Sequence, residues 1–112
     1  MDKDIVLCGA NSYEEKYYLN PDFSTLPESI QNELKIMCVL YVNDVGGILT
    51  LVYDEEGTLN FQVTSEEFDP LFDEIGSRLK IKNLQTEKEE LLTALQVYYK
   101  VFFLNEQPSE EV

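Results

Sequence analysis

The sequence predicts an α+β fold in which a β-hairpin is flanked by one long helix before it and two helices after it. Three observations support this prediction. Apolar residues recur at helical spacing over residues 27–45, they alternate with polar residues over 48–63 across an acidic turn, and helical spacing returns after residue 65. A chain of 112 residues fits one domain. We expect a single α+β domain over residues 1–105, followed by a polar C-terminal tail over residues 106–112.

The N-terminal elements are predicted from short patterns. Residues 4–8 are apolar enough to form a short strand. Ser12 can cap a short helix, which ends before Pro21 and carries three tyrosines, Tyr13, Tyr17 and Tyr18.

The long helix has the clearest pattern. Pro27 suits the first helical position, where a backbone N–H is not needed. One side of the helix carries the apolar residues Ile30, Leu34, Met37, Cys38, Tyr41 and Val45. Gly46 and Gly47 end the helix, because glycine adopts the left-handed conformation of a C-cap without strain. A phosphate-binding loop needs the reverse order, with a strand before the glycines and a helix after them, so this pair favours a helix end.

The hairpin is predicted because its turn and its strands agree. A three-residue loop after Asp54, with Gly57 in the left-handed conformation, closes the hairpin. This register places six apolar side chains on one face, pairing Tyr53 with Leu59, Leu51 with Phe61 and Leu49 with Val63. The acidic turn lacks the ligand spacing of a calcium loop. We therefore interpret it as a solvated hairpin tip.

The first helix after the hairpin is predicted to start at Ser65 or at Asp69. Its core-facing stripe consists of Phe68, Leu71, Phe72, Ile75 and Leu79. Arg78, Lys80 and Lys82 then form either the last turn of this helix or a short edge strand, and we favour the helix.

The last helix is predicted to open with a capping box, Thr86 with Glu89, and to run to about Leu104. Residues 94–104 are apolar nearly all round; Leu95, Tyr98 and Phe102 can face the hairpin, and other apolar residues point elsewhere. Either the chain encloses this helix by itself, or a second copy covers it. We expect a homo-oligomer, most simply a dimer, with a candidate interface formed by Val97, Val101, Phe102 and Leu104.

The charge and composition limit the chemistry. The net charge of −14 comes from 22 acidic and 8 basic residues, and it disfavours direct binding to nucleic acid while favouring a basic protein partner. Histidine is absent, and the two cysteines lack the CxxC spacing of a zinc site. We expect no metal and no cofactor. The N-terminus lacks the pattern of a signal peptide and no stretch is long enough to span a membrane, so a cytoplasmic location is expected.

A family resemblance is carried by the stretch CGANSYEEKYYLNP, the helix that follows Leu26 and Pro27, the stretch MCVLYVNDVGG and the hairpin. Together they resemble a family of small bacterial proteins known as a domain of unknown function. The resemblance implies a bacterial, cytoplasmic, stand-alone domain, and it provides no catalytic residues.

Three function classes stay open. The first is a non-catalytic protein-interaction or regulatory module. The second is an acidic nucleic-acid mimic or an immunity-type inhibitor, whose basic partner would bind Glu28, Glu33, Asp73, Glu74, Glu87 and Glu90. The third is a thiol-dependent enzyme that uses Cys8, although no histidine is present to activate the thiol. Burial of Cys8 at a strand end is the structural alternative.

Overall fold

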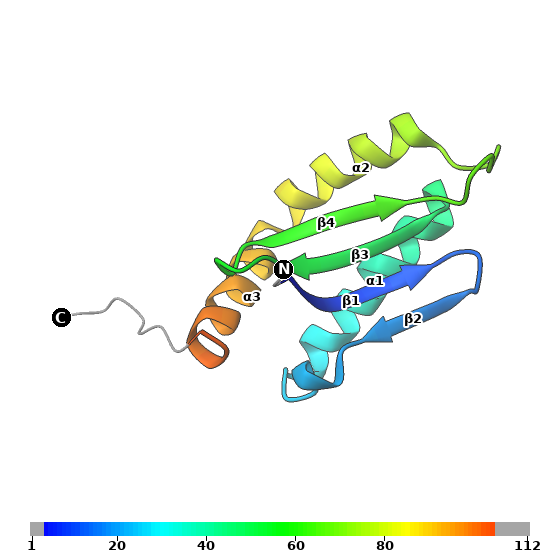
Figure 1. The fold of residues 1–112 in the computed structure, drawn as a ribbon. Coiled ribbons are helices and arrows are strands. Elements are labelled where there is room, and N and C mark those ends of the chain that lie inside the picture. The colour runs from blue at the N-terminus through cyan, green and yellow to red at the C-terminus, as the bar shows by residue number, and fades with distance from the viewer. Residues whose placement is uncertain (1–3, 105–112) are drawn as a thin grey trace.

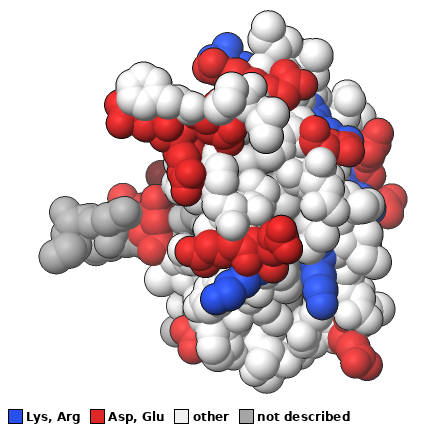
Figure 2. All heavy atoms as spheres, turned by 90° about the vertical axis from the view of Figure 1, so that its right-hand side faces the viewer, with Lys and Arg blue, Asp and Glu red and all other residues white. Residues whose placement is uncertain are grey.

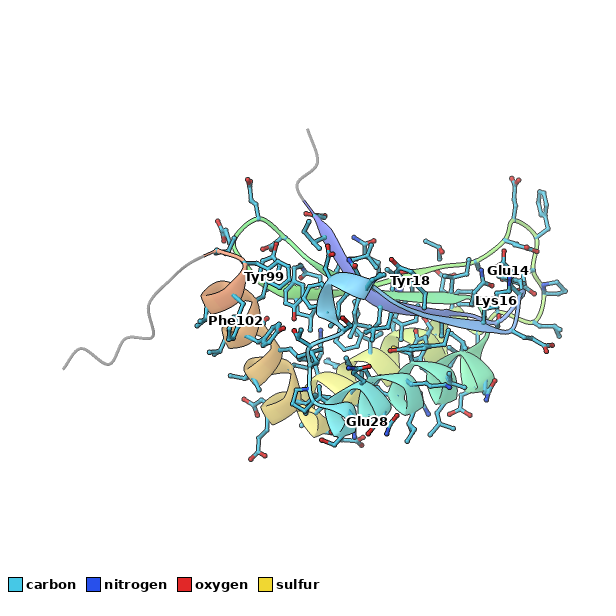
Figure 3. All side chains as sticks on the ribbon, turned by 90° about the horizontal axis from the view of Figure 1, so that it is seen from below. Glu14, Lys16, Tyr18, Glu28, Tyr99 and Phe102 are labelled. Atoms are coloured by element: carbon cyan, nitrogen blue, oxygen red, sulfur yellow. The ribbon has the colours of Figure 1, made fainter. Side chains whose placement is uncertain are left out.

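Four strands form one antiparallel sheet in the order β2-β1-β3-β4, and the three α-helices lie on one side of it (Figures 1 and 3). The computed structural model describes residues 4–104. The elements are β1 (Ile5–Asn11), β2 (Lys16–Leu19), the short 3-10 helix η1 (Pro21–Phe23), α1 (Glu28–Val45), β3 (Ile48–Tyr53), β4 (Leu59–Thr64), α2 (Glu74–Glu87) and α3 (Glu89–Phe102). The predicted α+β fold class is confirmed. Within the described residues, no helix is both long and apolar enough to cross a membrane. The predicted tail, 106–112, lies outside the described residues.

The N-terminal segment forms a second hairpin, so the predicted short helix is wrong. β1 extends to Asn11, whose side-chain oxygen accepts hydrogen bonds from the backbone N–H groups of Tyr13 and Glu14 and closes the turn. The chain then returns as β2, in which Tyr17 is half-buried and Tyr18 is exposed. Adjacent tyrosines fit a strand better than a helix, because an aromatic side chain packs well on a pleated surface whose residues alternate between two faces.

α1 is confirmed, with Pro27 at its N-cap, one position before the first helical position that was predicted for this residue. It begins directly after Pro27 and ends at Gly46, which has a φ of 81° and donates its N–H to the carbonyl of Val42. Its buried side includes Leu34, Cys38 and Tyr41, which are fully buried against β1, β2 and β3. α1 therefore covers the sheet from β2 to β3 and leaves the side of β4 to the later helices.

The hairpin register is confirmed pair by pair over Tyr53–Leu59, Leu51–Phe61 and Leu49–Val63. Gly57 has a φ of 88° and donates its N–H to the carbonyl of Asp54 at 2.9 Å. The Asp54 carboxylate also accepts hydrogen bonds from the N–H groups of Thr58 and Glu56, and these bonds hold the pKa of Asp54 below its usual value. The turn is thus closed by its own polar groups, as its sequence predicts.

α2 begins later than predicted and buries a different side. Its N-cap is Asp73, whose carboxylate accepts a hydrogen bond from the N–H of Gly76 at 2.9 Å. Ser77 and Leu84 are buried and Ile81 is half-buried, whereas the predicted core stripe faces solvent except for the half-buried Phe72. Two residues along a helix correspond to about 200°, so Leu79 and Ile81 lie on opposite sides and only one of them can face the core.

The basic residues and the start of α3 also differ from the prediction. Arg78, Lys80 and Lys82 lie within α2, so the helix interpretation is confirmed, but they stand in its middle. The predicted capping box is wrong, because the hydroxyl of Thr86 donates to the carbonyl of Lys82 and α3 has no side-chain cap. α2 passes directly into α3 at Lys88.

An aromatic stack joins η1, β3 and the end of α3. The ring centroids of Tyr53 and Tyr99 are 4.1 Å apart, those of Tyr99 and Phe103 are 5.0 Å apart, and those of Phe23 and Phe103 are 4.8 Å apart. The hydroxyl of Tyr53 donates to the carbonyl of Leu95 at 2.8 Å. Leu91, Leu95 and Tyr99 are the buried residues of α3, and the last two are buried at the contact with β3. Phe102, which was expected there, is exposed.

Candidate interaction surface

The outer side of α2 and the loop before it carry a row of exposed apolar side chains. Phe68, Leu71, Ile75 and Leu79 are 91%, 86%, 74% and 60% exposed. We call these four residues the outer stripe. Their spacing is three, four and four residues, which keeps Ile75 and Leu79 on one side of the helix. Apolar side chains scattered singly on a surface are common, whereas exposed apolar side chains that gather in one region favour a binding surface.

Polar contacts hold the loop that presents the outer stripe. The hydroxyl of Tyr13 donates to the carboxylate of Asp69 and accepts a hydrogen bond from the N–H of Glu66 at 3.0 Å. The same carboxylate accepts the N–H of Leu71 at 2.9 Å. The hydrogen bond from the Tyr13 hydroxyl and, to a smaller extent, the one from the Leu71 N–H hold the pKa of Asp69 below its usual value. Phe68 and Leu71 thus extend from a loop that is tied to the β1–β2 turn.

Phe72 anchors the other end of this loop. The N–H of Asp73 donates to the carbonyl of Val45 at 3.1 Å. The Phe72 ring lies so close to Gly47 that a Cβ on that glycine would be 2.8 Å from Phe72 Cε1. Phe72 is half-buried, whereas its neighbour Leu71, which lies in a hydrogen-bonded turn, is exposed.

Beside α2 in the fold, β4 forms one edge of the sheet and contains no charged residue. The N–H of Asp54 donates to the carbonyl of Thr58, which fixes the alternation of hydrogen-bonded pairs along the hairpin. By this alternation the backbone groups of Leu59, Phe61 and Val63 point away from β3. The N–H of Leu59 donates a hydrogen bond to the side-chain oxygen of Gln96 at 2.8 Å. Phe61 and Val63 direct their backbone groups toward the free edge.

A second apolar feature is the groove between α1 and α2. Met37, Tyr41 and Leu84 line it, together with Ile36 and Leu40, which are 59% and 57% exposed. Two ion pairs span it, Lys80 with Asp44 and Lys88 with Glu33, the latter at 3.2 Å. These pairs tie the two helices together across the groove.

The candidate dimer residues on α3 do not share one environment. Val97 and Phe102 are 52% and 67% exposed, whereas Val101 and Leu104 are half-buried. The ring of Phe102 lies 4.8 Å from that of Tyr98, centroid to centroid. Leu104 packs at the hairpin tip, where a Cβ on Gly57 would be 3.4 Å from Leu104 Cδ1. Of the four candidate residues, Val97 and Phe102 are therefore the ones that are mainly exposed to solvent, and Figure 3 shows Phe102 near the end of α3.

The candidate acidic residues fall into separate groups. Asp73 and Glu74 lie at the start of α2 and Glu87 lies at its end, which is about 20 Å away along a 14-residue helix. Glu33, Glu87 and Glu90 lie near the junction of α2 and α3, and Glu28 begins α1. On the face shown in Figure 2, acidic atoms form several groups with uncharged surface between them. A continuous acidic stripe is not present on that face.

The two thiols lie inside the protein between β1 and α1. Cys8 and Cys38 are both 0% exposed, and their sulfur atoms are 3.9 Å apart. Two causes raise the pKa of the Cys38 thiol: the larger is its contact with the Cys8 thiol, and the smaller is its burial. No group of three or more histidine, cysteine, aspartate or glutamate side chains is placed to hold a metal ion among residues 4–104.

Sequence reasoning missed the outer stripe because apolar residues at helical spacing usually face a core. The available signal was the second apolar pair, Ile81 and Leu84, which is out of phase with Ile75 and Leu79. A helix with apolar residues on two opposite sides cannot bury both against one sheet. One of the two sides must therefore face either solvent or a partner.

Comparison with known proteins places these features in a family whose description gives no activity. The model of a family of unknown function, DUF6145, matches residues 4–107. No curated protein and no solved structure matches the chain.

Proposed function

We propose that this chain, which belongs to the family of unknown function DUF6145, works as a non-catalytic protein-interaction module. The observation that carries the proposal is the outer stripe, in which Leu71, Ile75 and Leu79 are each more than half exposed. Removing a large apolar side chain from water stabilises a complex by about 1.5 to 3 kcal/mol before the costs of association are counted. A row of such side chains on a tied loop and a helix supports a binding role.

Binding is favoured over thiol chemistry because of where Cys8 lies. A nucleophilic cysteine acts as a thiolate and must reach its substrate. Cys8 is fully buried beside Cys38, and the buried Tyr17 hydroxyl lies near both thiols. This surrounding is suited to packing between β1 and α1.

The acidic-inhibitor alternative ranks second. Glu33 forms an ion pair with Lys88, and Glu74 forms one with Arg78 at 3.1 Å, so part of the candidate charge is already balanced. A basic partner would therefore contact separate acidic groups rather than one continuous acidic surface.

We also propose that a second copy binds at the outer side of α3, through Val97, Val101, Phe102 and Leu104. Between residues 94 and 104 the one charged residue is Lys100, so this side avoids much of the repulsion expected between two chains of net charge −14. Sedimentation equilibrium tests this dimer. The experiment uses about 100 μM protein, a concentration well above the micromolar dissociation constants of modest interfaces, and a species heavier than the 13.0 kDa monomer is expected. Phe102→Glu should dissociate it, and a persisting 13.0 kDa species in the unaltered protein would refute the dimer.

The interaction role is tested by affinity capture from the cells that produce the protein. The variant Ile75→Ser/Leu79→Ser removes the helical part of the outer stripe, and Ile36→Ser/Leu40→Ser is a matched control with the same residue types and similar exposure on α1. Both variants must keep the unaltered far-UV circular dichroism. We expect the first variant to lose the partners that the unaltered protein and the control retain. Equal recovery by all three proteins would contradict the proposal, and loss with the α1 control alone would move the site to the groove.

A further inference from the structure

We infer that the free edge of β4 binds an extended segment of a partner protein as an added strand, and that this segment is apolar in its centre with lysine or arginine at both ends. The inference rests on the proposed interaction role and names the chemistry of the partner. It follows from four features of the β4 side: the direction of the backbone groups, the lack of charge, the position of the outer stripe and the acidic residues at both ends of the strand.

The backbone of β4 offers hydrogen bonds to an added strand. Phe61 and Val63 direct their N–H and C=O groups to the free edge, as the register and the Asp54–Thr58 bond require. Gln96 blocks the start of this edge because its side chain accepts the N–H of Leu59. The open part of the edge therefore runs from Phe61 to the end of the strand.

β4 lacks the features that protect edge strands from pairing. Such strands commonly carry lysine, proline or a bulge, or they are very short. β4 is six residues long, has no charge or proline, and pairs with β3 without a register shift. The other edge strand, β2, has four residues and carries Lys16. The two edges thus differ, and the one beside the outer stripe is open to pairing.

The outer stripe lies on the helix side of this edge. α1 packs under β1, β2 and β3, and the side of α2 that carries Ser77 contacts α1, since the hydroxyl of Tyr41 donates to the Ser77 carbonyl. Ile75 and Leu79 lie on the opposite side of α2 and are exposed, and α2 itself runs along the β4 side of the molecule (Figure 1). A strand added to β4 would have one face on the helix side of the sheet and the other toward solvent, so alternate apolar residues suit it.

Acidic residues stand at both ends of β4. Glu55 and Glu56 precede it in the hairpin tip, Glu66 and Glu67 follow it, and all four are exposed. The three ion pairs recorded among residues 4–104 involve none of them. The two pairs are separated by the strand, which spans about 20 Å. A partner segment whose central residues pair with the open part of the edge, and whose basic ends reach the two acidic pairs, matches this arrangement.

The same charges disfavour a second copy at this edge. Antiparallel pairing of β4 with its own copy would bring the Glu55–Glu56 end of one chain to the Glu66–Glu67 end of the other. Like charges placed opposite each other weaken strand pairing. The edge therefore selects a different chain with basic ends, which leaves α3 as the surface for self-association.

The test uses synthetic peptides as probes and site-resolved amide hydrogen exchange as the readout. The probe has alternating valine and threonine over about six residues, with two lysines at each end. One control peptide has glutamates in place of the lysines, and another has proline at two central positions. In the free protein the amides of Asn60 and Gln62 point to β3 and should exchange slowly, whereas those of Phe61 and Val63 point to the free edge and should exchange fast. We expect the lysine-ended peptide to slow exchange at Phe61 and Val63, and both controls to bind at least about tenfold more weakly.

Two protein variants sharpen the result. Glu66→Lys/Glu67→Lys should weaken the lysine-ended peptide and favour the glutamate-ended one, while Glu87→Lys/Glu90→Lys makes the same change of charge away from β4 and should leave the preference unchanged. Fast exchange at Phe61 and Val63 with every peptide would overturn the inference, and so would protection confined to α3 or to the α1–α2 groove. The interaction role fails separately, if affinity capture recovers no partner that depends on Ile75 and Leu79.

Discussion

At the scale of single residues, the interior between β1, β2 and α1 holds an unusual polar group. The hydroxyl of Tyr17 is buried and has no hydrogen-bond partner within the described residues, and it lies near the Cys8 and Cys38 thiols. The burial of its hydroxyl and, to a smaller extent, the nearby Cys8 thiol raise the pKa of Tyr17. This cluster is a structural feature of the core, and its properties can be measured without knowing the partner.

The thiols should react slowly in the native protein. Both cysteines are fully buried, so a thiol reagent can reach them only when the structure opens. We expect both to react at a rate that rises steeply with urea and becomes fast in the unfolded chain. The rate is measured by the absorbance of the coloured thiolate that a disulfide reagent releases when it reacts with a cysteine. Fast stoichiometric labelling of Cys8 under native conditions would contradict its burial and revive the thiol-enzyme alternative.

The buried tyrosines should make the protein lose stability in alkali. Burial raises the pKa of Tyr17, Tyr41 and Tyr53 above the ordinary value. In the unfolded chain tyrosine ionises at about pH 10, so above this pH the unfolded state binds fewer protons than the native state and the free energy of unfolding falls. Urea unfolding at pH 8 and at about pH 10.5 should show this fall, with phenolate absorbance appearing as the chain unfolds.

Tyr17→Phe provides the matched test. It removes a buried hydroxyl without a partner, so at neutral pH the free energy of unfolding should stay the same or rise by up to about 1 kcal/mol. It should also reduce the alkaline loss. A clear destabilisation at neutral pH would show that the hydroxyl has a stabilising partner after all.

At the scale of elements, predictions succeeded where two local signals agreed. The hairpin was predicted to the residue because the glycine at position 57 and the side-chain alternation of both strands select the same register. α1 was predicted because Pro27, the apolar spacing and Gly46 mark its start, its buried side and its end. Each of these elements carries its own boundary residues.

Predictions failed where the outcome depends on which neighbours an element meets. The prediction of a short helix gave too little weight to the strand preference of Tyr17 and Tyr18, and pairing with β1 decides for the strand. α2 has two apolar sides, and packing against α1 selects Ser77, Ile81 and Leu84 for the inside. The candidate site on α2 could therefore not be predicted from spacing. The same holds for the exposed position of Phe102, whose expected place is taken by Tyr99 in the aromatic stack.

The helix caps give a direct test of the element boundaries. Asp73→Ala removes the carboxylate that accepts the Gly76 N–H, and it should cost about 0.5 to 2 kcal/mol of unfolding free energy. Thr86→Ala should change it by less than about 0.5 kcal/mol, because the Thr86 hydroxyl does not cap α3. Urea denaturation of both variants measures the difference. An equal cost for the two would support the capping box at Thr86 that the structure does not show.

At the scale of the whole molecule, the net charge of −14 opposes compactness. Raising the salt concentration from about 0.01 M to about 0.15 M shortens the Debye length from about 30 Å to about 8 Å, so the melting temperature should rise. Mild acid should act in the same direction. Below about pH 4 the direction should reverse, because the pKa values of Asp54 and Asp69 are lowered in the folded state and their contribution is lost as they are protonated. A melting temperature that falls with added salt would contradict the repulsion.

The central claim is that the outer side of α2 binds a protein in the cell, and photo-crosslinking measures this most directly. A photoreactive amino acid replaces Leu79 on the outer stripe or, as a control, Leu40, which is 57% exposed on α1 against 60% for Leu79. After illumination of the cells that produce the protein, the account predicts a discrete crosslinked product with another protein at Leu79 and none of that product at Leu40. The absence of any product at Leu79, or the same products at both positions, would contradict it.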